Sequence, residues 1–321
     1  MRKKKIITYL AALGFILILN FLLPRLLPGD PFMAIYGEEA ALSLSEAAKE
    51  ELRAKMNLDK SLIAQFKVYL LTLAKGDLGY SYALNQPVRT VISKVLPWTL
   101  LLVGSALILS TLIGLILGIE SGWRRGTRAD RWILLTVVGL SALPNFLIGI
   151  LLLLFFAVQL GWFPLGGAVT PYSGFTGTAY LLDVFKHLFL PLLALTLAQV
   201  PRSYLLTRAS VLGNLSYPYV RTAAAKGLKP LQIRYKHVGR NSLLPISASL
   251  GVSVGSALAG SLFIEIVFSY PGMGSLIHQA IAQRDYPLLQ GILLVIALTV
   301  ILANLATDIL ASKIDPRIRK E

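Results

Sequence analysis

Six runs of apolar residues, each near the length that crosses a bilayer, constrain this chain more than any other feature. A helix needs about 20 predominantly apolar residues to span the hydrocarbon core of a membrane. Over the whole chain 55% of the residues are hydrophobic and only 15% are charged, as expected for an integral membrane protein. We therefore predict an all-α membrane protein whose six transmembrane helices cover residues 6–23, 98–119, 132–160, 187–207, 243–268 and 288–311.

The basic residues predict how these helices cross the membrane. A net charge of +15 could indicate a nucleic-acid partner, but Lys and Arg gather at the ends of the apolar runs, so no nucleic acid is expected. Because Lys and Arg are enriched in cytoplasmic loops, we expect both termini inside and a location in the cytoplasmic membrane. The basic stretches are residues 1–5, 124–131, 208–240 and 313–320, whereas the short outer loops hold only Lys186 and Arg284.

This topology divides the chain into four parts. The first, residues 1–27, holds a span that we interpret as retained, because its apolar run is long for a signal peptide and no small-residue cleavage site follows. The others are an extracytoplasmic loop at 28–97, a five-helix core at 98–311 with a cytoplasmic loop at 208–242, and a cytoplasmic tail at 312–321.

The long hydrophilic region at residues 28–97 carries eight acidic and eight basic side chains. Ser43 and Glu46 fit a capping box that opens a helix through about Met56. A second helix is predicted because apolar residues recur at helical spacing, at Leu62, Phe66, Tyr69, Leu70 and Leu73. We interpret the region as two small amphipathic helices on the outer face, with docking of a soluble partner as the alternative.

Small residues four positions apart predict close helix packing in two spans. In the second span these are Gly114 and Gly118. The fifth span has a ridge of Ser247, Gly251, Gly255 and Ala259. In the third span Pro144 precedes Asn145, and a proline there removes a backbone hydrogen bond, so we expect a kink or a break.

Few polar side chains lie within the spans. We expect Arg202 to reach the cytoplasmic interface, His187 to be an interfacial residue rather than a ligand, and Glu265 to face water rather than substrate. The chain has no cysteine, phosphate-binding loop, zinc-protease motif or nucleophile elbow. We therefore expect no enzymatic activity, no metal site and no bound cofactor, and the scarcity of charge within the spans disfavours an ion-coupled carrier.

The segment from Tyr219 to Pro245 is a strongly basic interruption between two apolar runs and contains no acidic residue. An alanine-rich run ends there at Gly227, and Pro230 cannot continue a helix, so a short helix is predicted before the glycine. The basic residues of this segment are Arg221, Lys226, Lys229, Arg234, Lys236 and Arg240. Such a segment suits contact with another macromolecule, and anionic lipid is the plainer alternative.

Several motifs follow one another in a consistent order from residue 25 to residue 319: RLLPGDPF, KGDLGYSY, PVRTVISKVLPWTL, SALPNF, YVRTAAAKGL with RYKHVGRNSLLP, EIVFSYPGMGSL with RDYPLLQG, and DPRIR. With these motifs the chain resembles bacterial ABC-importer permeases, in the branch that includes dipeptide, oligopeptide and nickel permeases. The general permease loop reads E-A-A-x-x-x-G, whereas Arg221, Thr222 and Ala223 occupy its first three places here and Gly227 the last. The peptide and nickel branch shows a similar basic variant.

The resemblance implies a type I ABC-importer permease fold and a non-catalytic transport role. The partners implied are a second homologous permease, two cytoplasmic ATPase subunits that bind ATP and Mg²⁺, an extracytoplasmic substrate-binding protein and the lipid bilayer. In this superfamily a coupling helix of the cytoplasmic loop seats in a groove of the ATPase. That role would fall here to Tyr219, Arg221, Thr222, Ala223, Ala224, Ala225, Lys226, Gly227 and Leu228.

The resemblance also implies that the chain forms half of a translocation path. Three polar or kinked sites, Asn145, Gln199 and Ser253, are the candidates to line it. Peptides are the expected substrates, and nickel or metal chelates and oligosaccharides are the alternatives within the same machinery. The alternatives from other classes are a secondary carrier that acts alone and a membrane scaffold without a pathway.

Overall fold

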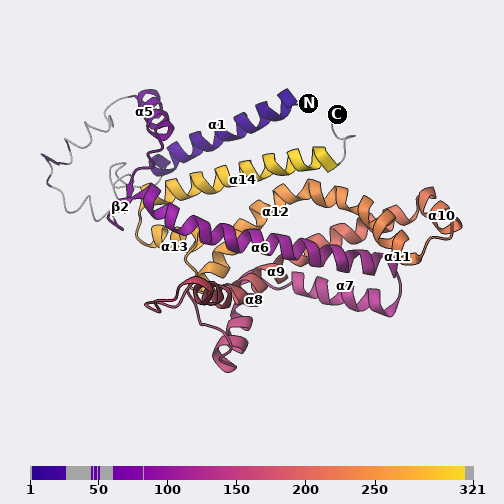
Figure 1. The fold of residues 1–321 in the computed structure, drawn as a ribbon. Helices are drawn as coiled ribbons and strands as arrows, with labels where there is room; N and C mark the ends of the chain where they lie inside the picture. The colour runs from indigo at the N-terminus through magenta and orange to yellow at the C-terminus, as the bar shows by residue number, and fades with distance from the viewer. Residues whose placement is uncertain are drawn as a thin grey trace. The chain divides into compact units, whose positions relative to one another are not determined.

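The structure of the protein, a computed structural model, describes residues 2–26, 45, 47, 48, 50, 61–81 and 83–314. These residues are mostly helical, and one short hairpin is present (Figure 1). The helix predicted through Met56 with its capping box and the DPRIR motif lie outside the described residues. The chain divides into two compact units, one of residues 1–97 with 272–301 and the other of residues 98–271 with 302–321.

The first unit begins with α1 (Arg2–Leu26) and α5 (Leu62–Ala74). Ser61 caps α5, because its hydroxyl accepts a hydrogen bond from the Ala64 N–H at 3.4 Å. This helix confirms the helical spacing predicted from Leu62 onward. Strands β1 (Tyr80–Ser81) and β2 (Gln86–Pro87) form an antiparallel hairpin, and the unit also holds α13 (Met273–Ala282) and the first parts of α6 (Val88–Trp123) and α14 (Tyr286–Ile314).

Polar contacts join distant parts of the first unit. The side-chain amide of Asn20 in α1 donates to the Gln290 carbonyl of α14 at 3.1 Å, and the Gln290 amide donates to the Asn20 carbonyl in return. The Ser81 hydroxyl of the hairpin donates to Asp285 Oδ2 at 2.5 Å, beside the start of α14. An apolar core lies between α6, α13 and α14 and contains Val88, Val91, Ile92, Met273, Leu276, Ala280, Leu288 and Ile292.

The second unit is built around α9 (Gly177–Leu215), which packs against α7 (Arg128–Ser141), α8 (Asn145–Leu152) and α12 (Arg240–Val267). The buried face of α9 includes Leu190, Ala194, Leu195, Tyr204 and Val211. Between α9 and α12 lie α10 (Pro218–Ala225), α11 (Pro230–Gln232) and the π-helical segment η2 (Ile233–Gly239). A second π-helical segment, η1 (Leu153–Gln159), continues α8.

Four helices of the described chain are long and apolar enough to cross a membrane: Val88–Trp123, Gly177–Leu215, Pro230–Val267 and Tyr286–Ile309. The bent pair of α7 with α8 and η1 would make a fifth span. The described apolar part of α1, Ile7–Leu22, is shorter. The helices extend beyond the apolar runs, because polar residues at their ends continue the helical hydrogen bonding. Six spans and the orientation of the termini stay a prediction.

The break predicted at Pro144 is confirmed. α7 ends at Ser141, Pro144 precedes the first residue of α8, and the two helices are bent by 101° (Figure 1). Proline cannot donate a backbone hydrogen bond, and it disfavours a helical conformation at the residue before it. The stretch predicted as one kinked span therefore consists of two helices.

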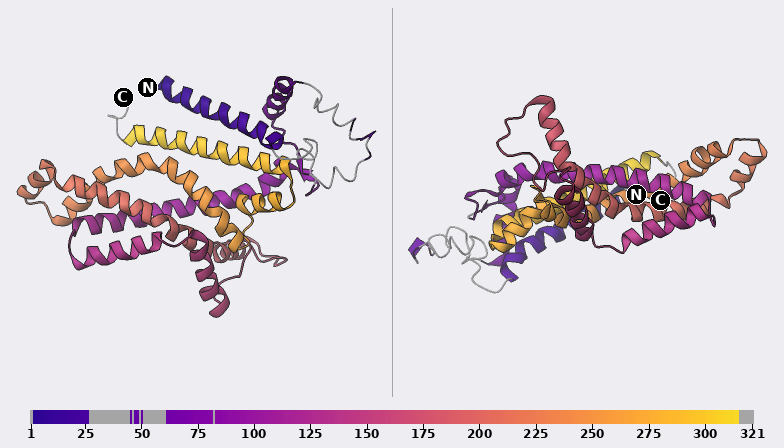
Figure 2. Two further views of the ribbon diagram at one scale, coloured as in Figure 1. Left: turned by 180° about the vertical axis from the view of Figure 1, so that it is seen from behind. Right: turned by 90° about the horizontal axis from the view of Figure 1, so that it is seen from below.

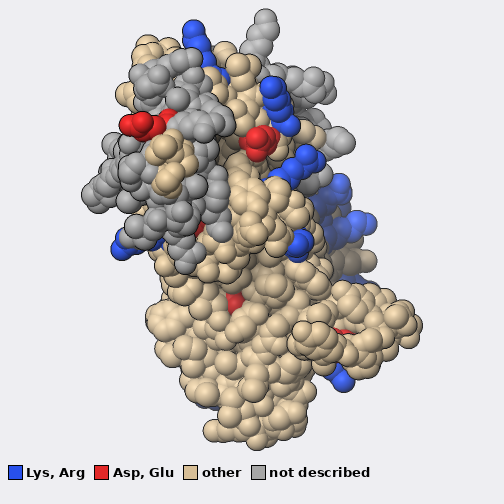
Figure 3. Space-filling model, turned by 90° about the vertical axis from the view of Figure 1, so that its left-hand side faces the viewer, with Lys and Arg blue, Asp and Glu red and all other residues tan. Residues whose placement is uncertain are grey.

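Much of the molecular surface is uncharged, which suits a lipid environment. Figure 3 shows one face on which uncharged residues cover most of the described surface and few acidic side chains are visible. Many large apolar side chains are exposed on the membrane-length helices, for example Ile108 at 62% and Leu302 at 63%. The buried polar residues described below are therefore exceptions in a largely apolar protein.

Candidate functional site

The basic loop, residues 216–239, joins α9 to α12 and projects beyond the ends of both helices (Figures 1 and 2). Its first helix, α10, begins with Pro218, at a position where a missing N–H removes no helical hydrogen bond. Residues 223–225 are alanines, which have the highest helix propensity. The short helix predicted before Gly227 is therefore present.

α10 ends in a Schellman motif, which turns the chain back toward the helix bundle. The Leu228 N–H donates to the Ala223 carbonyl at 3.3 Å, and the Gly227 N–H donates to the Ala224 carbonyl at 2.9 Å. Gly227 has a φ of +73°, in the left-handed region that glycine adopts without strain. The helix therefore ends in a left-handed turn at the glycine where the sequence predicts its end.

The tip of the loop presents an exposed face of small and basic residues. These residues, which we call the tip face, are Arg221, Thr222, Ala224, Ala225, Lys226 and Gly227. Tyr219 and Leu228, the ends of the predicted coupling segment, are half-buried. The Tyr219 hydroxyl donates to Asn214 Oδ1 of α9 at 3.2 Å, which ties the start of α10 to the helix before it.

Ala223 does not lie on the tip face, although it belongs to the predicted coupling segment. It is only 5% exposed and belongs to an apolar cluster with Ile119 of α6, Val211 of α9 and Ile233 of η2. Its neighbours on either side in the sequence point outward because successive residues of a helix are about 100° apart. Ala223 therefore packs within its own chain.

Glu120, in the last turn of α6, gathers three donors at the base of the basic loop. Arg234 Nη1 lies 2.7 and 2.9 Å from the two carboxylate oxygens, and the Tyr235 hydroxyl donates at 2.7 Å. Arg124 Nη2 lies 3.1 Å from Oε2. The guanidinium carbon of Arg234 also lies 5.2 Å from the ring centre of Trp123, within cation–π distance. This cluster connects α6 to η2.

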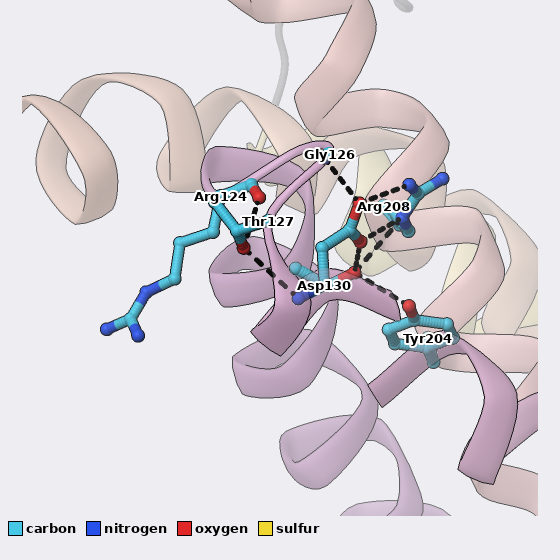
Figure 4. Close-up of polar contacts among 7 residues, drawn as sticks. Arg124, Gly126, Thr127, Asp130, Tyr204 and Arg208 are labelled. Atoms are coloured by element: carbon cyan, nitrogen blue, oxygen red, sulfur yellow. Dashed lines mark hydrogen bonds and ion pairs between the residues drawn. The ribbon is translucent and has the colours of Figure 1, made fainter. Parts of the chain in front are cut away.

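A second polar cluster joins the ends of α6, α7 and α9 (Figure 4). Asp130 accepts from Arg208 Nε at 3.1 Å and Nη2 at 3.0 Å, from the Ser121 hydroxyl at 2.5 Å and from the Gly126 N–H at 2.9 Å. The Tyr204 hydroxyl lies 2.7 Å from Ser121 Oγ. Asp130 is 4% exposed, so this carboxylate is buried with its charge paired.

Neither cluster is predicted from the sequence, in which the arginines of both are interpreted only as signs of topology. One signal was available, because Glu120 and Asp130 are the only acidic residues between positions 98 and 182. Both lie beside arginines in an otherwise basic stretch. Their partners Arg234 and Arg208 follow 114 and 78 residues later, so the pairing depends on tertiary structure.

Two of the three pathway candidates lie beside the same point of α12. A Cβ atom added at Gly260 would stand 2.8 Å from Asn145 Nδ2 and 3.6 Å from Gln199 Nε2. Gln199 is 7% exposed and Asn145 is half-buried. Ser253 lies about two helical turns from Gly260 on α12 and is 8% exposed, and its hydroxyl donates to the Ser249 carbonyl at 3.0 Å. The structure thus gathers all three on or against α12.

The prediction that Glu265 faces water is wrong. Its side chain is fully buried, and its carboxylate accepts hydrogen bonds from the Thr99 hydroxyl at 2.9 Å and the Ser261 hydroxyl at 3.3 Å. A buried carboxylate needs such donors, because burial without hydrogen bonds is strongly unfavourable. Position near the end of an apolar run therefore did not reveal the buried surroundings of Glu265.

The other two polar residues of the spans differ from each other in burial. Arg202 is exposed, and its position at the cytoplasmic interface stays a prediction. His187 is only 7% exposed, and its Nδ1 lies 2.9 Å from the Asp183 carbonyl; its expected interfacial position stays a prediction. Within the described ranges no group of three or more His, Asp or Glu side chains could hold a metal ion.

The paired glycines of α6 lie against α9. A Cβ atom added at Gly114 would stand 2.5 Å from Ser203 Cβ, and one added at Gly118 would stand 2.5 Å from Thr207 Cβ and 2.9 Å from the Tyr204 carbonyl oxygen. Real Cβ atoms do not approach so closely, so the helix pair depends on the absence of side chains at these positions.

The small-residue ridge of α12 follows the packing only in part. A Cβ atom at Gly251 would overlap the side chains of Asn304 and Thr307 of α14, but Gly255 is half-buried and Ala259 is exposed. Residues four apart turn by about 40° around a helix, so a ridge of this spacing leaves the packed face after a few turns. Gly260, rather than Ala259, lies on the buried side.

The chain matches a family model described as binding-protein-dependent transport system inner membrane component, over residues 110–320. It is 38% identical over 315 residues to a putative peptide permease of Brucella ovis, with 97% of each chain covered. It is 35% identical over 320 residues to the di/tripeptide transport system permease DppB of Pseudomonas aeruginosa, covering 95% of this chain and 94% of the relative.

Two further comparisons concern another relative and a solved structure. The chain is 35% identical over 317 residues to the glutathione transport system permease GsiC of Pectobacterium atrosepticum, covering 98% of this chain and 97% of the relative. Its fold is similar to a chain of the MetNI methionine ABC transporter, solved in inward-facing conformations. The TM-score is 0.58 at 16% identity, and 70% of this chain and 96% of that chain are covered.

Proposed function

Because the chain belongs to the family of binding-protein-dependent transport system inner membrane components, we propose that it is the permease subunit of an ATP-driven importer of di- and oligopeptides. The observation that carries this proposal is the identity of 38% and 35% to two peptide permeases over 97% and 95% of the chain. The subunit itself is not an enzyme in this proposal, since its sequence holds no phosphate-binding loop.

The proposed function requires partner chains. ATP and Mg²⁺ bind to two cytoplasmic ATPase subunits, and a second permease completes the translocation path. An extracytoplasmic binding protein delivers the peptide. The subunit lies in the cytoplasmic membrane with both termini inside, an orientation supported by the basic stretches at residues 1–5, 124–131, 208–240 and 313–320.

The tip face is the proposed docking surface for an ATPase subunit. It is exposed, it projects at the end of α9 and α12, and its small residues Ala224 and Ala225 permit a close approach. Arg221 and Lys226 supply positive charge for acidic side chains or carbonyl groups of the partner. Because Ala223 packs against α6 and α9, a displacement of the tip face is transmitted directly to these two helices.

The proposed translocation path passes α12 near Gly260. Asn145 and Gln199 supply amide groups there, and the Ser253 hydroxyl lies about two helical turns along α12. Such groups suit the backbone of a peptide because its N–H and C=O groups need hydrogen-bond partners. The break before α8 supports this placement, since irregular backbone at membrane depth is tolerated where it borders protein or a water-filled cavity.

Reconstitution of the complete complex in proteoliposomes tests the proposed function. We expect uptake of a labelled tripeptide that needs internal ATP and external binding protein, and we expect competition by other short peptides. Glutathione belongs among the competitors because a glutathione permease is 35% identical to this chain. Uptake of nickel chelates or oligosaccharides in place of peptides, or uptake by this chain alone along a proton or sodium gradient, would contradict the proposal.

A further inference from the structure

Glu120 joins the end of α6 to the returning arm of the basic loop. We propose that Glu120 is a positioning residue for energy coupling. Its carboxylate holds η2 on α6, so that a displacement of the tip face is passed to the transmembrane helices. This inference rests on the proposed function, because it takes the tip face as the place where an ATPase subunit docks.

The geometry at Glu120 fixes both the distance and the direction of η2. One guanidinium nitrogen of Arg234 reaches both carboxylate oxygens, and the neighbouring Tyr235 hydroxyl shares Oε1. Charge-assisted hydrogen bonds of this kind are stronger than neutral ones and depend on orientation. The side chains of Arg234 and Glu120 are 13% and 20% exposed, so water screens the pair only partly.

Arg234 depends on this contact. Its Nε atom is buried and has no hydrogen-bond partner among the described residues, and its Nη1 atom is satisfied by Glu120. Trp123, on the same helix as Glu120, contacts the guanidinium with its ring. If the carboxylate were removed, a largely buried guanidinium would lose its charged partner, which is unfavourable. Arg234 would then turn toward water and draw η2 away from α6.

The other residues that pack the basic loop on α6 form an apolar cluster, which carries little directional information. Ala223, Ile233 and Val238 of the loop pack with Ile119 of α6, and hydrophobic contacts of this kind permit sliding. A Cβ atom added at Gly239 would stand 3.0 Å from Ile119 Cδ1, so η2 approaches α6 closely here. The Glu120 contact is therefore what sets the register of η2 against α6.

The π-helical form of η2 is a further indication that its register against α6 has a function. π-helical turns are rare, and those found inside α-helices are frequently at functional sites. Arg234 and Tyr235 are consecutive residues of this segment, and both reach one carboxylate. Glu120 therefore stabilises one position of the π-helical segment, and with it the angle at which α10 leaves the bundle.

The pair of Asp130 and Arg208 offers a matched control. It is likewise an ion pair with two hydrogen bonds near the end of α6, but it joins α7 to α9 and neither residue belongs to the basic loop. Asp130→Asn therefore removes a comparable charge without touching η2. A general loss of stability would follow from either change, whereas a loss of coupling is expected only at Glu120.

The test uses the reconstituted complex and measures ATP hydrolysis with and without peptide-loaded binding protein. We expect Glu120→Gln and Arg234→Gln each to lower the stimulation about threefold to tenfold while basal hydrolysis continues. The stimulation of the double variant should be no lower than that of the more impaired single variant, because both changes remove the same contact. Asp130→Asn should keep the stimulation. Unchanged stimulation in Glu120→Gln, or single effects that multiply in the double variant, would overturn the proposal.

A second measurement is independent of transport. The chain has no cysteine, so Lys229→Cys provides a single site for a spin label on an exposed residue of the basic loop. In the full chain in lipid nanodiscs, Glu120→Gln should increase the mobility of the label and Asp130→Asn should not. Equal mobility in all three proteins would refute the positioning role. If the unaltered complex shows no stimulation by peptide, the proposed function fails. The mobility of the label still shows whether Glu120 keeps η2 in place on α6.

Discussion

At the scale of single residues, the tip of the basic loop depends on one backbone conformation. Gly227 has a φ of +73°, and a Cβ atom added there would meet nothing within 4 Å. A substitution is therefore unfavourable because of the backbone and not because of a clash. A residue other than glycine costs about 1–2 kcal/mol in the left-handed region, and asparagine is among the residues that tolerate it best.

This conformation predicts a ranking of variants at Gly227. Gly227→Val should lower the binding-protein-stimulated ATP hydrolysis of the complex, because a β-branched residue distorts the Schellman motif and tilts α10. Gly227→Asn should retain most of the stimulation. Assays of both variants in the same liposomes make the comparison. Equal activity of the two, whether high or low, would show that the left-handed turn has no role in coupling.

Single residues also show which features could be predicted from the sequence and which could not. Gly227 could be assigned because a glycine after an alanine run has a local meaning for the backbone. The burial of Ala223 and Glu265 could not be assigned, because it depends on side chains more than 100 positions away, Ile119 and Thr99. Nothing in the neighbouring sequence distinguishes an acid that faces water from one that accepts hydrogen bonds inside the bundle.

At the scale of helices, the contact between α6 and α9 depends on the glycines of α6. A Cβ atom at Gly118 would stand 2.5 Å from Thr207 Cβ, whereas one at Gly104 of the same helix would have nothing within 4 Å. The two glycines therefore differ in packing while sharing one helix. The break before α8 and the small residues of α6 could be predicted, because proline and glycine act through the local backbone.

Gly118→Ala should destabilise the protein by about 1–3 kcal/mol, the usual effect of overpacking. Gly104→Ala should be neutral or slightly stabilising, because alanine favours a helix more than glycine does. Thermal unfolding of both variants in the same detergent measures the difference. If Gly104→Ala lowered the unfolding temperature as much as Gly118→Ala, close packing of α6 on α9 would not be the cause.

The ion pairs between helices could not be predicted from the sequence. Positive charge at Arg208 and Arg234 was correctly placed at the ends of helices, but it was interpreted only as a topology signal. The structure adds that each arginine is paired with an acid of the preceding helices. Such pairs form across 78 and 114 residues, and periodicity within one helix carries no information about them.

At the scale of the whole molecule, the proposed function makes this chain one subunit of a complex whose other subunits are separate proteins. Composition and charge predicted a helical membrane protein, and the family followed from motifs spread over the chain. The tip face is the feature that connects this chain to an energy source in the proposed function. It is exposed, and it is anchored to α6 and α9 by Ala223, Tyr219 and the Glu120 cluster.

Site-specific cross-linking measures this central claim most directly. Because the chain lacks cysteine, Thr222→Cys and Ala225→Cys each place one thiol on the tip face, and Ala223→Cys places one in the packed interior. In membranes that contain the complete complex, positions 222 and 225 should cross-link to an ATPase subunit, and position 223 should not. Cross-links of equal yield at all three positions, or none at 222 and 225, would contradict the proposed docking of the tip face.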